Sequence, residues 1–458
     1  MKSSIKKLLL SAGILSCAFG ASAQMTYSGY FLDNYAYRFQ MNPAFGNDKG
    51  FVSFPALGDI NIGMHGTLNV SDVVYPLNGK TVLFTNPGIS EKEVMSKIKD
   101  RNRIGSNVKL DILSVGFKAF GGYNAVSLST VANLEASVPK SFFKLAKEGV
   151  TNSTYDIKDM FGCADAYAQI ALNHSRDIKP VPGLRVGASL KVLVGLGNVD
   201  FKFNDAYLKL SENEWVAQTN ADIYASITGL EFDHDINDKT GNRYVSGANV
   251  DNGFGVNGFG MALDLGAEYK WTDFRFSAAV LDLGFMSWGK THWASTNGTK
   301  TVSTDAYTFN ASGDASNSFK KEWDRFTGDL AQLYELQDMG EMNSRSKMLG
   351  ATLNFGVDYE FPLYRRLNFG LLNSTRVNGC YSWTQFRLSA DVNPIDFLSV
   401  GVNGAVGTYG AAFGWMLNIH TTGFNLFAGM DHTVGKLSKQ FIPLNSNNSF
   451  NFGINFPF

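Results

Sequence analysis

The chain has 458 residues and is nearly neutral, with 40 Lys and Arg against 41 Asp and Glu. Only 18% of its residues are charged, whereas 44% are hydrophobic and 13% are aromatic. This much apolar surface can bury a core, which excludes a disordered protein. The near-zero net charge argues against a nucleic-acid-binding protein, because such proteins need a basic surface.

The first 23 residues have the pattern of a secretory signal peptide. Three lysines precede the apolar stretch 8–20, and Ala21-Ser22-Ala23 forms a small-residue cleavage site before Gln24. The apolar stretch is too short to span a bilayer as a helix. Cys17 allows a second interpretation, a lipid-modified N-terminus, but the Ala-Ser-Ala site fits better. We therefore predict export, with cleavage after residue 23.

Two cysteines remain after cleavage, Cys163 and Cys380. Their separation fits no metal-ligand spacing and forms no dense disulfide framework. A single disulfide and two free thiols both stay open in an oxidising compartment.

Apolar and polar residues alternate along most of the mature chain. In the segment 258–271 the odd-numbered positions are apolar or aromatic, and the even-numbered positions are small or charged. A period of two predicts a strand and not a helix. The strands have about 10–14 residues, longer than the ~5–6 usual in soluble sheets and close to the ~9–11 needed to cross a bilayer obliquely. The pattern predicts a transmembrane antiparallel β-barrel, with a soluble sandwich as the alternative.

Short and long connections alternate along the predicted strands, as the short periplasmic turns and long extracellular loops of outer-membrane barrels do. The long connections are 71–107, 139–163, 228–257, 285–349 and 433–448. Counting every segment gives sixteen strands. The pair 199–210 and 216–227 is weakly patterned, so a barrel of 14–16 strands is predicted, with fourteen and sixteen both open. The sixteen segments are 58–70, 108–118, 123–138, 164–175, 184–196, 199–210, 216–227, 258–271, 273–284, 350–361, 367–375, 380–391, 397–407, 411–421, 424–432 and 449–458.

The same alternation directs a set of charged side chains into the barrel lumen. Their mixed signs favour ion pairs that stiffen the wall, and a selective ion path is the alternative. The candidates are Arg185, Lys191, Asp264, Glu268, Lys270, Asp358, Glu360, Arg387 and Asp391.

The sequence gives no catalytic constellation. It contains no Gly-x-Ser-x-Gly elbow and no phosphate-binding loop. Asp431 and His432 are adjacent, but neighbouring strand residues point to opposite faces and cannot form a dyad. We predict no enzyme activity, no catalytic residues, no cofactor and no bound metal.

Both ends of the mature chain carry further signals. The C-terminal segment alternates phenylalanines and ends with Phe456 and Phe458, which resembles the closing-strand signal read by the outer-membrane assembly machinery. An ordinary edge strand is the alternative. Asn42-Pro43-Ala44, in the leader before the first strand, resembles the same tripeptide in FadL-type long-chain fatty-acid transporters and their PorV-like relatives.

A closer resemblance extends from this tripeptide to residue 149. The segments 103–105, 110–117, 138–140 and 145–149 are similar to those of an uncharacterised family of Bacteroidetes outer-membrane barrels, known only as a domain of unknown function. The resemblance implies a FadL-like barrel and an outer-membrane location. It carries no established functional residues.

The predicted organisation is a signal peptide at 1–23, a leader or plug at 24–57 and a barrel at 58–458. Loop helices are expected at 90–102, 140–149 and 324–338, either capping the barrel mouth or packing on its rim. One functional hypothesis is FadL-like passive uptake of a hydrophobic or amphipathic small molecule. The alternative is a PorV-like barrel that binds an envelope or secreted protein without transport. The expected partners are the lipid bilayer, the assembly machinery, and either that ligand or that protein, with no nucleic acid.

Overall fold

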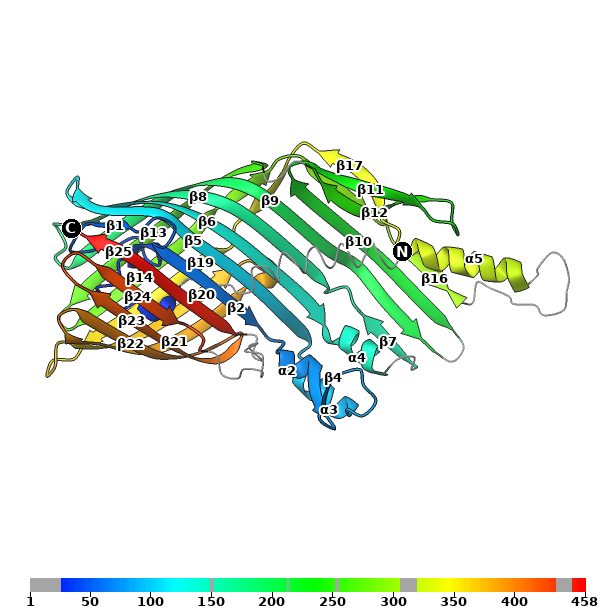
Figure 1. Cartoon of the computed structure of the whole chain (residues 1–458), viewed down its shortest axis with the longest axis horizontal. Coiled ribbons are helices and arrows are strands. Elements are labelled where there is room, and N and C mark those ends of the chain that lie inside the picture. The colour runs from blue at the N-terminus through cyan, green and yellow to red at the C-terminus, as the bar shows by residue number, and fades with distance from the viewer. Residues whose placement is uncertain (1–25, 149–151, 212–213, 252–254, 305–318, 434–446) are drawn as a thin grey trace.

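The computed structural model describes residues 26–148, 152–211, 214–251, 255–304, 319–433 and 447–458. The predicted signal peptide, 1–23, lies outside the described residues. The described chain forms an elongated β-barrel whose strands run obliquely along the long axis (Figure 1). No described helix is long and apolar enough to cross a membrane.

The barrel wall is a closed antiparallel sheet of fourteen strands. It closes where the last strand pairs with the first two short ones, so no hydrogen-bonding edge is left in the wall. In wall order the strands are β1 (Phe51–Ser53) with β2 (Asp59–Gly66), β5 (Arg101–Ala119), β6 (Gly122–Pro139), β8 (Phe161–Asp177), β9 (Leu184–Leu210), β13 (Gly258–Trp271), β14 (Phe274–Trp288), β19 (Ala351–Glu360), β20 (Leu367–Val377), β21 (Trp383–Ile395), β22 (Leu398–Gly407), β23 (Gly410–His420), β24 (Asn425–Met430) and β25 (Asn448–Pro457).

The predicted barrel of 14–16 strands is confirmed, with fourteen as the correct count. The count of sixteen was wrong because the segments 184–196 and 199–210 are one strand. β9 runs unbroken through this region. A bulge opposite Ala166 and Tyr167 lies where the sequence predicted a break between two strands. The first part of β9, up to Gly195, pairs with β13. The second part, from Gly197 onward, pairs with β10 (Trp215–Ile227). The segment 216–227 therefore belongs to an extension of the sheet beyond the barrel wall, which starts from the second part of β9.

The extension adds further strands to the second part of β9 and β14. β10 also pairs with β15 (Thr291–Ser295) and β16 (Lys300–Ser303), and β15 pairs with β17 (Gln337–Met342). β7 (Ser153–Asp156) pairs with β9, and β18 (Arg345–Met348) pairs with β14. A separate hairpin, β11 (Leu230–Ile236) with β12 (Arg243–Val250), and helix α5 (Phe319–Gln332) complete this region.

A small subdomain projects sideways from the wall (Figure 1). It contains α2 (Val70–Val73), β3 (Val74–Leu77), β4 (Lys80–Leu83), α3 (Glu91–Lys97) and α4 (Lys140–Glu148). Val94 of α3 and Phe143 of α4 share one buried apolar cluster, so these two helices pack on each other beside the rim. The third expected helix is α5, which begins earlier than predicted and ends at Gln332.

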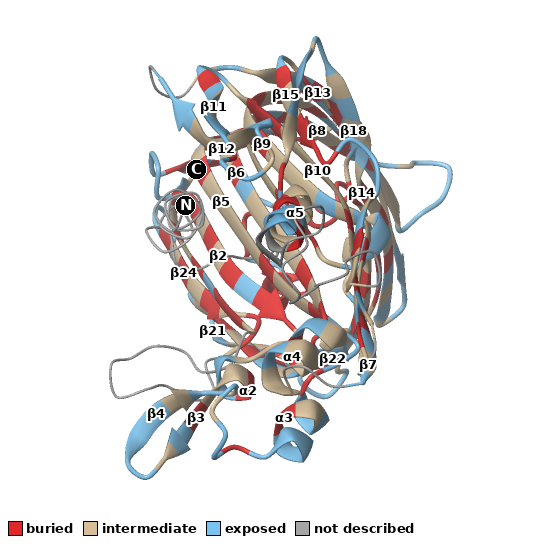
Figure 2. Ribbon diagram, turned by 90° about the vertical axis from the view of Figure 1, so that its right-hand side faces the viewer, coloured by how far each residue is buried: buried red, intermediate tan, exposed pale blue. Residues whose placement is uncertain are grey.

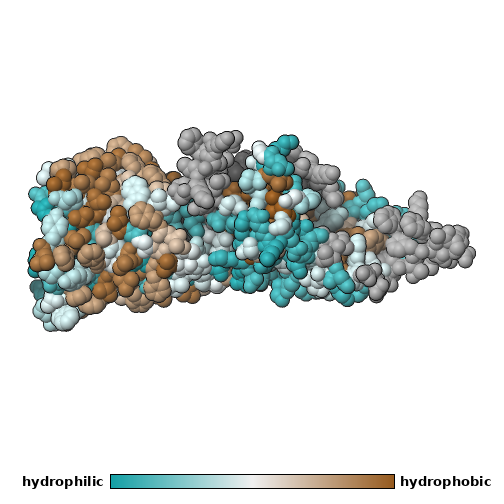
Figure 3. All heavy atoms as spheres, turned by 90° about the horizontal axis from the view of Figure 1, so that it is seen from below, coloured by the Kyte–Doolittle hydropathy of each residue, from teal (hydrophilic) through white to brown (hydrophobic). Residues whose placement is uncertain are grey.

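The outer surface of the barrel carries the apolar belt that a bilayer requires. In β13, Phe259, Met261, Leu263 and Leu265 are exposed, while Asp264 on the other face is 1% exposed. The belt covers one end of the molecule (Figure 3). The tight turns lie at the ends of the strands on that side, for example Phe120-Gly121, whose φ angles of 55° and 72° fit a two-residue hairpin turn.

Replacing Leu388 by arginine is expected to lower the free energy of unfolding by about 2–4 kcal/mol, because a charge then faces lipid near mid-membrane. The Leu388 side chain, in the middle of β21, is 65% exposed on the outer face. Denaturant unfolding in lipid vesicles, followed by tryptophan fluorescence, measures the change. Leu363→Arg is the matched control, since Leu363 is 89% exposed but lies in the turn between β19 and β20. Equal effects of the two substitutions would contradict a lipid-facing Leu388.

Candidate functional site

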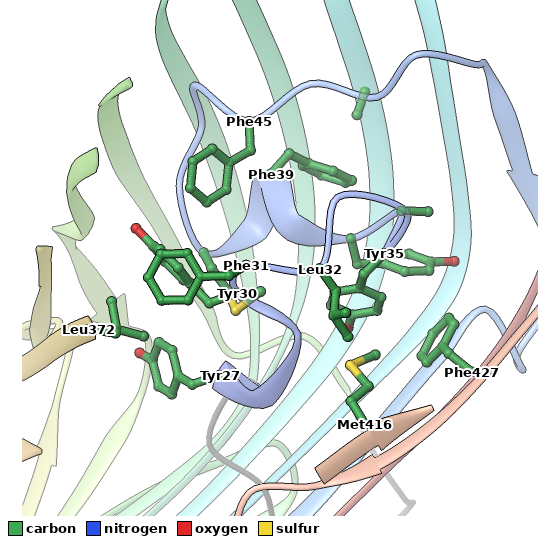
Figure 4. Packing of buried hydrophobic residues seen from close by; sticks show 14 of the residues in the cluster. Tyr27, Tyr30, Phe31, Leu32, Tyr35, Phe39, Phe45, Leu372, Met416 and Phe427 are labelled. Carbon is green, nitrogen blue, oxygen red and sulfur yellow. The ribbon is translucent and has the colours of Figure 1, made fainter. Parts of the chain in front are cut away.

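Residues 26–50, the plug segment, run inside the barrel and fill part of its lumen. They form two short 3₁₀ turns, η1 (Tyr27–Gly29) and η2 (Arg38–Gln40), and most of their side chains are buried. Figure 4 shows the aromatic rings of this segment gathered against the inner wall. Figure 2, a view at right angles to that of Figure 1, shows buried residues along the strands that surround the lumen, interspersed with intermediate and exposed ones.

The plug segment packs as an aromatic cluster. Tyr35 and Tyr37 contact Phe427 of β24 edge to face, with ring centroids 5.0 and 5.6 Å apart. Tyr27 lies 6.5 Å from Trp383 of β21 in the same geometry. Such ring pairs add about 0.5–1.5 kcal/mol each to the free energy of burial. The plug is therefore a packed core and not a loosely held peptide.

An upper clamp, Asp431 with Arg387, holds the start of the plug segment. The Asp431 carboxylate accepts the backbone N–H groups of Tyr27 at 2.8 Å and Ser28 at 2.6 Å, and the Ser28 hydroxyl at 2.5 Å. Arg387 lies 3.4 Å from the same carboxylate, and both side chains are almost fully buried. Removing one partner of a buried ion pair is costly, because it leaves an uncompensated buried charge.

A lower clamp holds the middle of the plug segment through Asp33. Arg275 of β14 reaches Asp33 at 2.6 Å, Asp358 at 2.5 Å and Glu268 at 3.5 Å. Arg38, on the plug itself, also pairs with Asp33 and donates from Nε to the Tyr30 carbonyl at 2.9 Å. The Asp33 side chain is half exposed, so solvent screens this clamp more than the upper one.

The Asn42-Pro43-Ala44 tripeptide docks on the wall. The Asn42 amide donates to the carbonyls of Ala267 and Ala278, at 3.2 and 3.4 Å, and its side-chain oxygen accepts the Ala44 N–H at 3.0 Å. On the wall side, Gly187 leaves room for the tripeptide. A Cβ at Gly187 would lie 2.1 Å from the Pro43 carbonyl oxygen.

The remaining predicted lumen charges have local partners. Lys191 pairs with Asp264 at 2.7 Å and with Asp282 at 2.6 Å, all three facing the interior. Arg185 donates to the Ser175 hydroxyl at 3.2 Å, and Asp391 accepts from Ser389 at 3.0 Å. This arrangement favours a stiffened wall over an ion path.

Two predicted lumen charges do not reach the lumen centre. Glu360 pairs with Arg365 of the β19–β20 turn at 2.8 Å, at the rim of the barrel. Lys270 is exposed near the end of β13. The terminal Phe456 and Phe458 are exposed too, at 40% and 67%. Their role as an assembly signal stays a prediction.

A chamber of about 150 Å³ lies beside the start of the plug segment. A cavity of this size holds a benzene-sized molecule. Its lining is mixed, with aromatic rings and methionines, amide side chains and paired charges. The apolar and aromatic part includes Tyr27, Tyr167, Met286, Trp288, Tyr381 and Trp383, and the charged part consists of Lys109, Lys191, Lys347, Arg376, Glu135, Asp165 and Asp282.

The sequence directed Arg387, Glu268 and Asp358 into the lumen but did not predict the two clamps to which they belong. Asp431 was considered only as half of a catalytic dyad with His432, and its actual contacts are to the plug and Arg387. Asp33, Arg38 and Arg275 were not singled out. The dense run of aromatic residues from Tyr27 to Phe45 was a signal that this leader has a buried environment.

Both cysteines are free thiols in the structure, so the disulfide left open by the sequence is not formed. Cys163 is buried, with the Lys347 ammonium 2.9 Å from its sulfur. Cys380 lies in η4 (Gly379–Tyr381), outside the membrane-spanning strands, where partial burial raises the pKa of its thiol.

The chain belongs to the family described as "Family of unknown function (DUF5723)", which matches residues 43–431. The resemblance to a domain of unknown function is thereby confirmed. No protein with curated annotation matches the sequence.

Several solved barrels are similar to this chain at low identity. The toluene transporter TodX of P. putida is 9% identical with a TM-score of 0.40, over 96% of this chain and 97% of that one. The toluene transporter TbuX of Ralstonia pickettii is 8% identical with a TM-score of 0.42, over 92% of each chain. A FadL homologue of Pseudomonas aeruginosa is 10% identical with a TM-score of 0.38, over 91% and 90%. At these values the likeness says nothing about a ligand.

Replacing Gly187 by alanine is expected to displace the plug segment, because the new methyl group overlaps the Pro43 backbone. Overpacking of this kind costs about 1–3 kcal/mol, which raises the population with a displaced plug by about fivefold or more. Trypsin cleavage at Arg38, 4% exposed in the native state, reports that population. Gly404→Ala is the matched control, since nothing lies within 4 Å of a Cβ there. Equal cleavage rates in both variants would refute the docking of the tripeptide on Gly187.

Proposed function

We propose that this protein is an outer-membrane barrel that admits a small amphipathic molecule, with the plug segment as its gate. The observation that carries the proposal is the chamber lined partly by the plug itself. Tyr27 is both a chamber residue and the first residue held by the upper clamp. A molecule bound in the chamber therefore touches the gate directly. The apolar belt and the predicted signal peptide support the outer-membrane location.

The lining of the chamber favours an amphipathic ligand over a purely hydrophobic one. Trp288 and Trp383 offer apolar ring surface, whereas Lys347 and Asp165 offer charge. Transfer of an entirely apolar molecule past buried charges brings no compensating hydrogen bonds. A ligand with one polar and one apolar end satisfies both parts of the lining.

The wall behind the plug is suited to displacement of the plug. Several buried polar side chains line the wall behind the plug, including those of Asn354, Ser374, Asn418 and Asn451. A polar group that is buried without a hydrogen bond lowers the free energy of unfolding by about 1–3 kcal/mol. Water entering a vacated lumen would hydrate them, which offsets part of the cost of moving the aromatic plug. A polar inner wall is what a water-filled pore requires.

Replacing Asp431 by alanine is expected to open the lumen, because the plug loses three hydrogen bonds and Arg387 loses its carboxylate. Removing one partner of a buried pair costs about 3–5 kcal/mol. In planar bilayers the mean conductance should rise at least fivefold over the wild type. In liposomes the influx of hexyl glucoside, a neutral amphiphile, should rise with it.

Asp396→Ala is the matched control for this experiment. Asp396 pairs with Arg366 in a periplasmic turn and its side chain is 88% exposed, so the same change there leaves the plug untouched. If both folded variants show the conductance of the wild type, the gating proposal is wrong. Retention of the compact band on unheated gels establishes that each barrel is folded.

A second candidate, a barrel that binds another envelope protein, is favoured by the extension. β9, β10, β15 and β16 carry the sheet well beyond the apolar belt, where it cannot contribute to a pore (Figures 1 and 3). Native purification in mild detergent followed by mass spectrometry separates the two candidates. A stoichiometric protein with no bound small molecule would favour the second.

A further inference from the structure

A second cleft opens next to the chamber, and we refer to it as the rim cleft. His65 of β2 lines the chamber, and Thr67, two residues on, lines the rim cleft. The His65 ring packs 4.9 Å from Tyr409, whose neighbour Thr408 also lines the rim cleft. These neighbouring residues place the rim cleft beside the chamber.

Arg103 lines the rim cleft and contacts a segment whose neighbouring residues line the chamber. Its guanidinium donates to the Ser382 carbonyl at 2.5 Å. Ser382 stands between Tyr381 and Trp383, both of which line the chamber. A molecule whose head touches Arg103 therefore has aromatic chamber surface next to it.

Three cations line the rim cleft, Lys99, Arg101 and Arg103. Arg101 and Arg103 are two residues apart in β5, so their side chains leave the strand on the same face. Arg101 pairs with Asp159 at 3.1 Å, and both side chains are nearly half exposed. In the described part of the chain, no carboxylate lies within ion-pair distance of Lys99 or Arg103.

Two carboxylates, Asp100 and Asp159, line the rim cleft beside the three cations, so the cleft has an excess of one positive charge. An anion bound among the three cations gains a favourable Coulomb interaction with each of them. Arginine forks match the two oxygens of a carboxylate or phosphate, and lysine adds a point charge. The aromatic rings of Tyr381 and Trp383 in the chamber have no preference for an anion and are suited to an apolar chain.

We propose that the rim cleft binds an oxyanion, a carboxylate or a phosphate, at the head of the amphipathic molecule that the chamber admits. This inference rests on the proposed function and narrows its ligand to anionic amphiphiles. The head lies between Lys99, Arg101 and Arg103, and the apolar part points towards Tyr381 and Trp383.

Three short amphiphiles of equal chain length test the inference: hexyl phosphate, hexanoate and hexyl glucoside. Binding to the full-length protein in nanodiscs is measured by isothermal titration calorimetry. The wild type should bind at least one of the two anions fivefold or more tightly than hexyl glucoside. Lys99→Gln combined with Arg101→Gln should abolish that preference and leave the affinity for hexyl glucoside within twofold. High salt should weaken anion binding in the wild type.

Lys80→Gln combined with Lys92→Gln is the matched control. Both lysines are exposed on the small subdomain, and their loss changes the net charge equally, away from the rim cleft. A preference that survives in the Lys99/Arg101 variant, or that is lost equally in the control, overturns the inference. Competition by inorganic phosphate at the same affinity as hexyl phosphate also overturns it, in favour of a free-phosphate site.

The failure of the inference is distinct from the failure of the proposed function. If hexyl glucoside binds the wild type as tightly as both anions, the rim cleft has no selectivity but the chamber still takes an amphiphile. If none of the three probes binds, and Asp431→Ala admits no hexyl glucoside into liposomes, the uptake function itself is wrong.

Discussion

A sheet inside a bilayer finds no water for its backbone groups, so every strand in the wall must have two neighbours. That constraint governs the rest of this molecule. Fourteen strands enclose a lumen wider than short wall side chains can fill, and the inner face must carry polar residues because the outer face carries the apolar ones. The plug segment fills this space with rings, and buried carboxylates and guanidinium groups tie the rings to a polar wall.

The sequence predicted what depends on local pattern. The alternation in 258–271 appears in β13 as exposed Phe259 and Leu265 and buried Asp264. The strand count failed at β9, because alternation does not reveal that one strand changes its partner at Gly195–Gly197. The clamps could not be predicted from local sequence patterns, for a related reason. Asp431 lies about four hundred positions from Tyr27 in the chain, and only closure of the barrel brings them together.

The two clamps are unequal, and the difference bears on how a gate of this kind works. Asp431 and Arg387 are almost fully buried, whereas Asp33 is half exposed. Solvent screens the second clamp, so the buried one dominates the retention of the plug. The chamber meets the plug at Tyr27, next to the buried clamp. In the gating proposal, a ligand shifts the equilibrium of the plug only by binding its two positions unequally, and the Tyr27 contact is where such a difference would arise.

The shared strand β9 also fixes an order of events during assembly. Its first part pairs with β13, but between the two in the chain lie β10 and the β11–β12 hairpin on the far side of the membrane. The polypeptide after β9 must therefore be carried to the outside before β13 can return and extend the wall. We therefore expect translocation of this segment to precede strand pairing in the second half of the barrel.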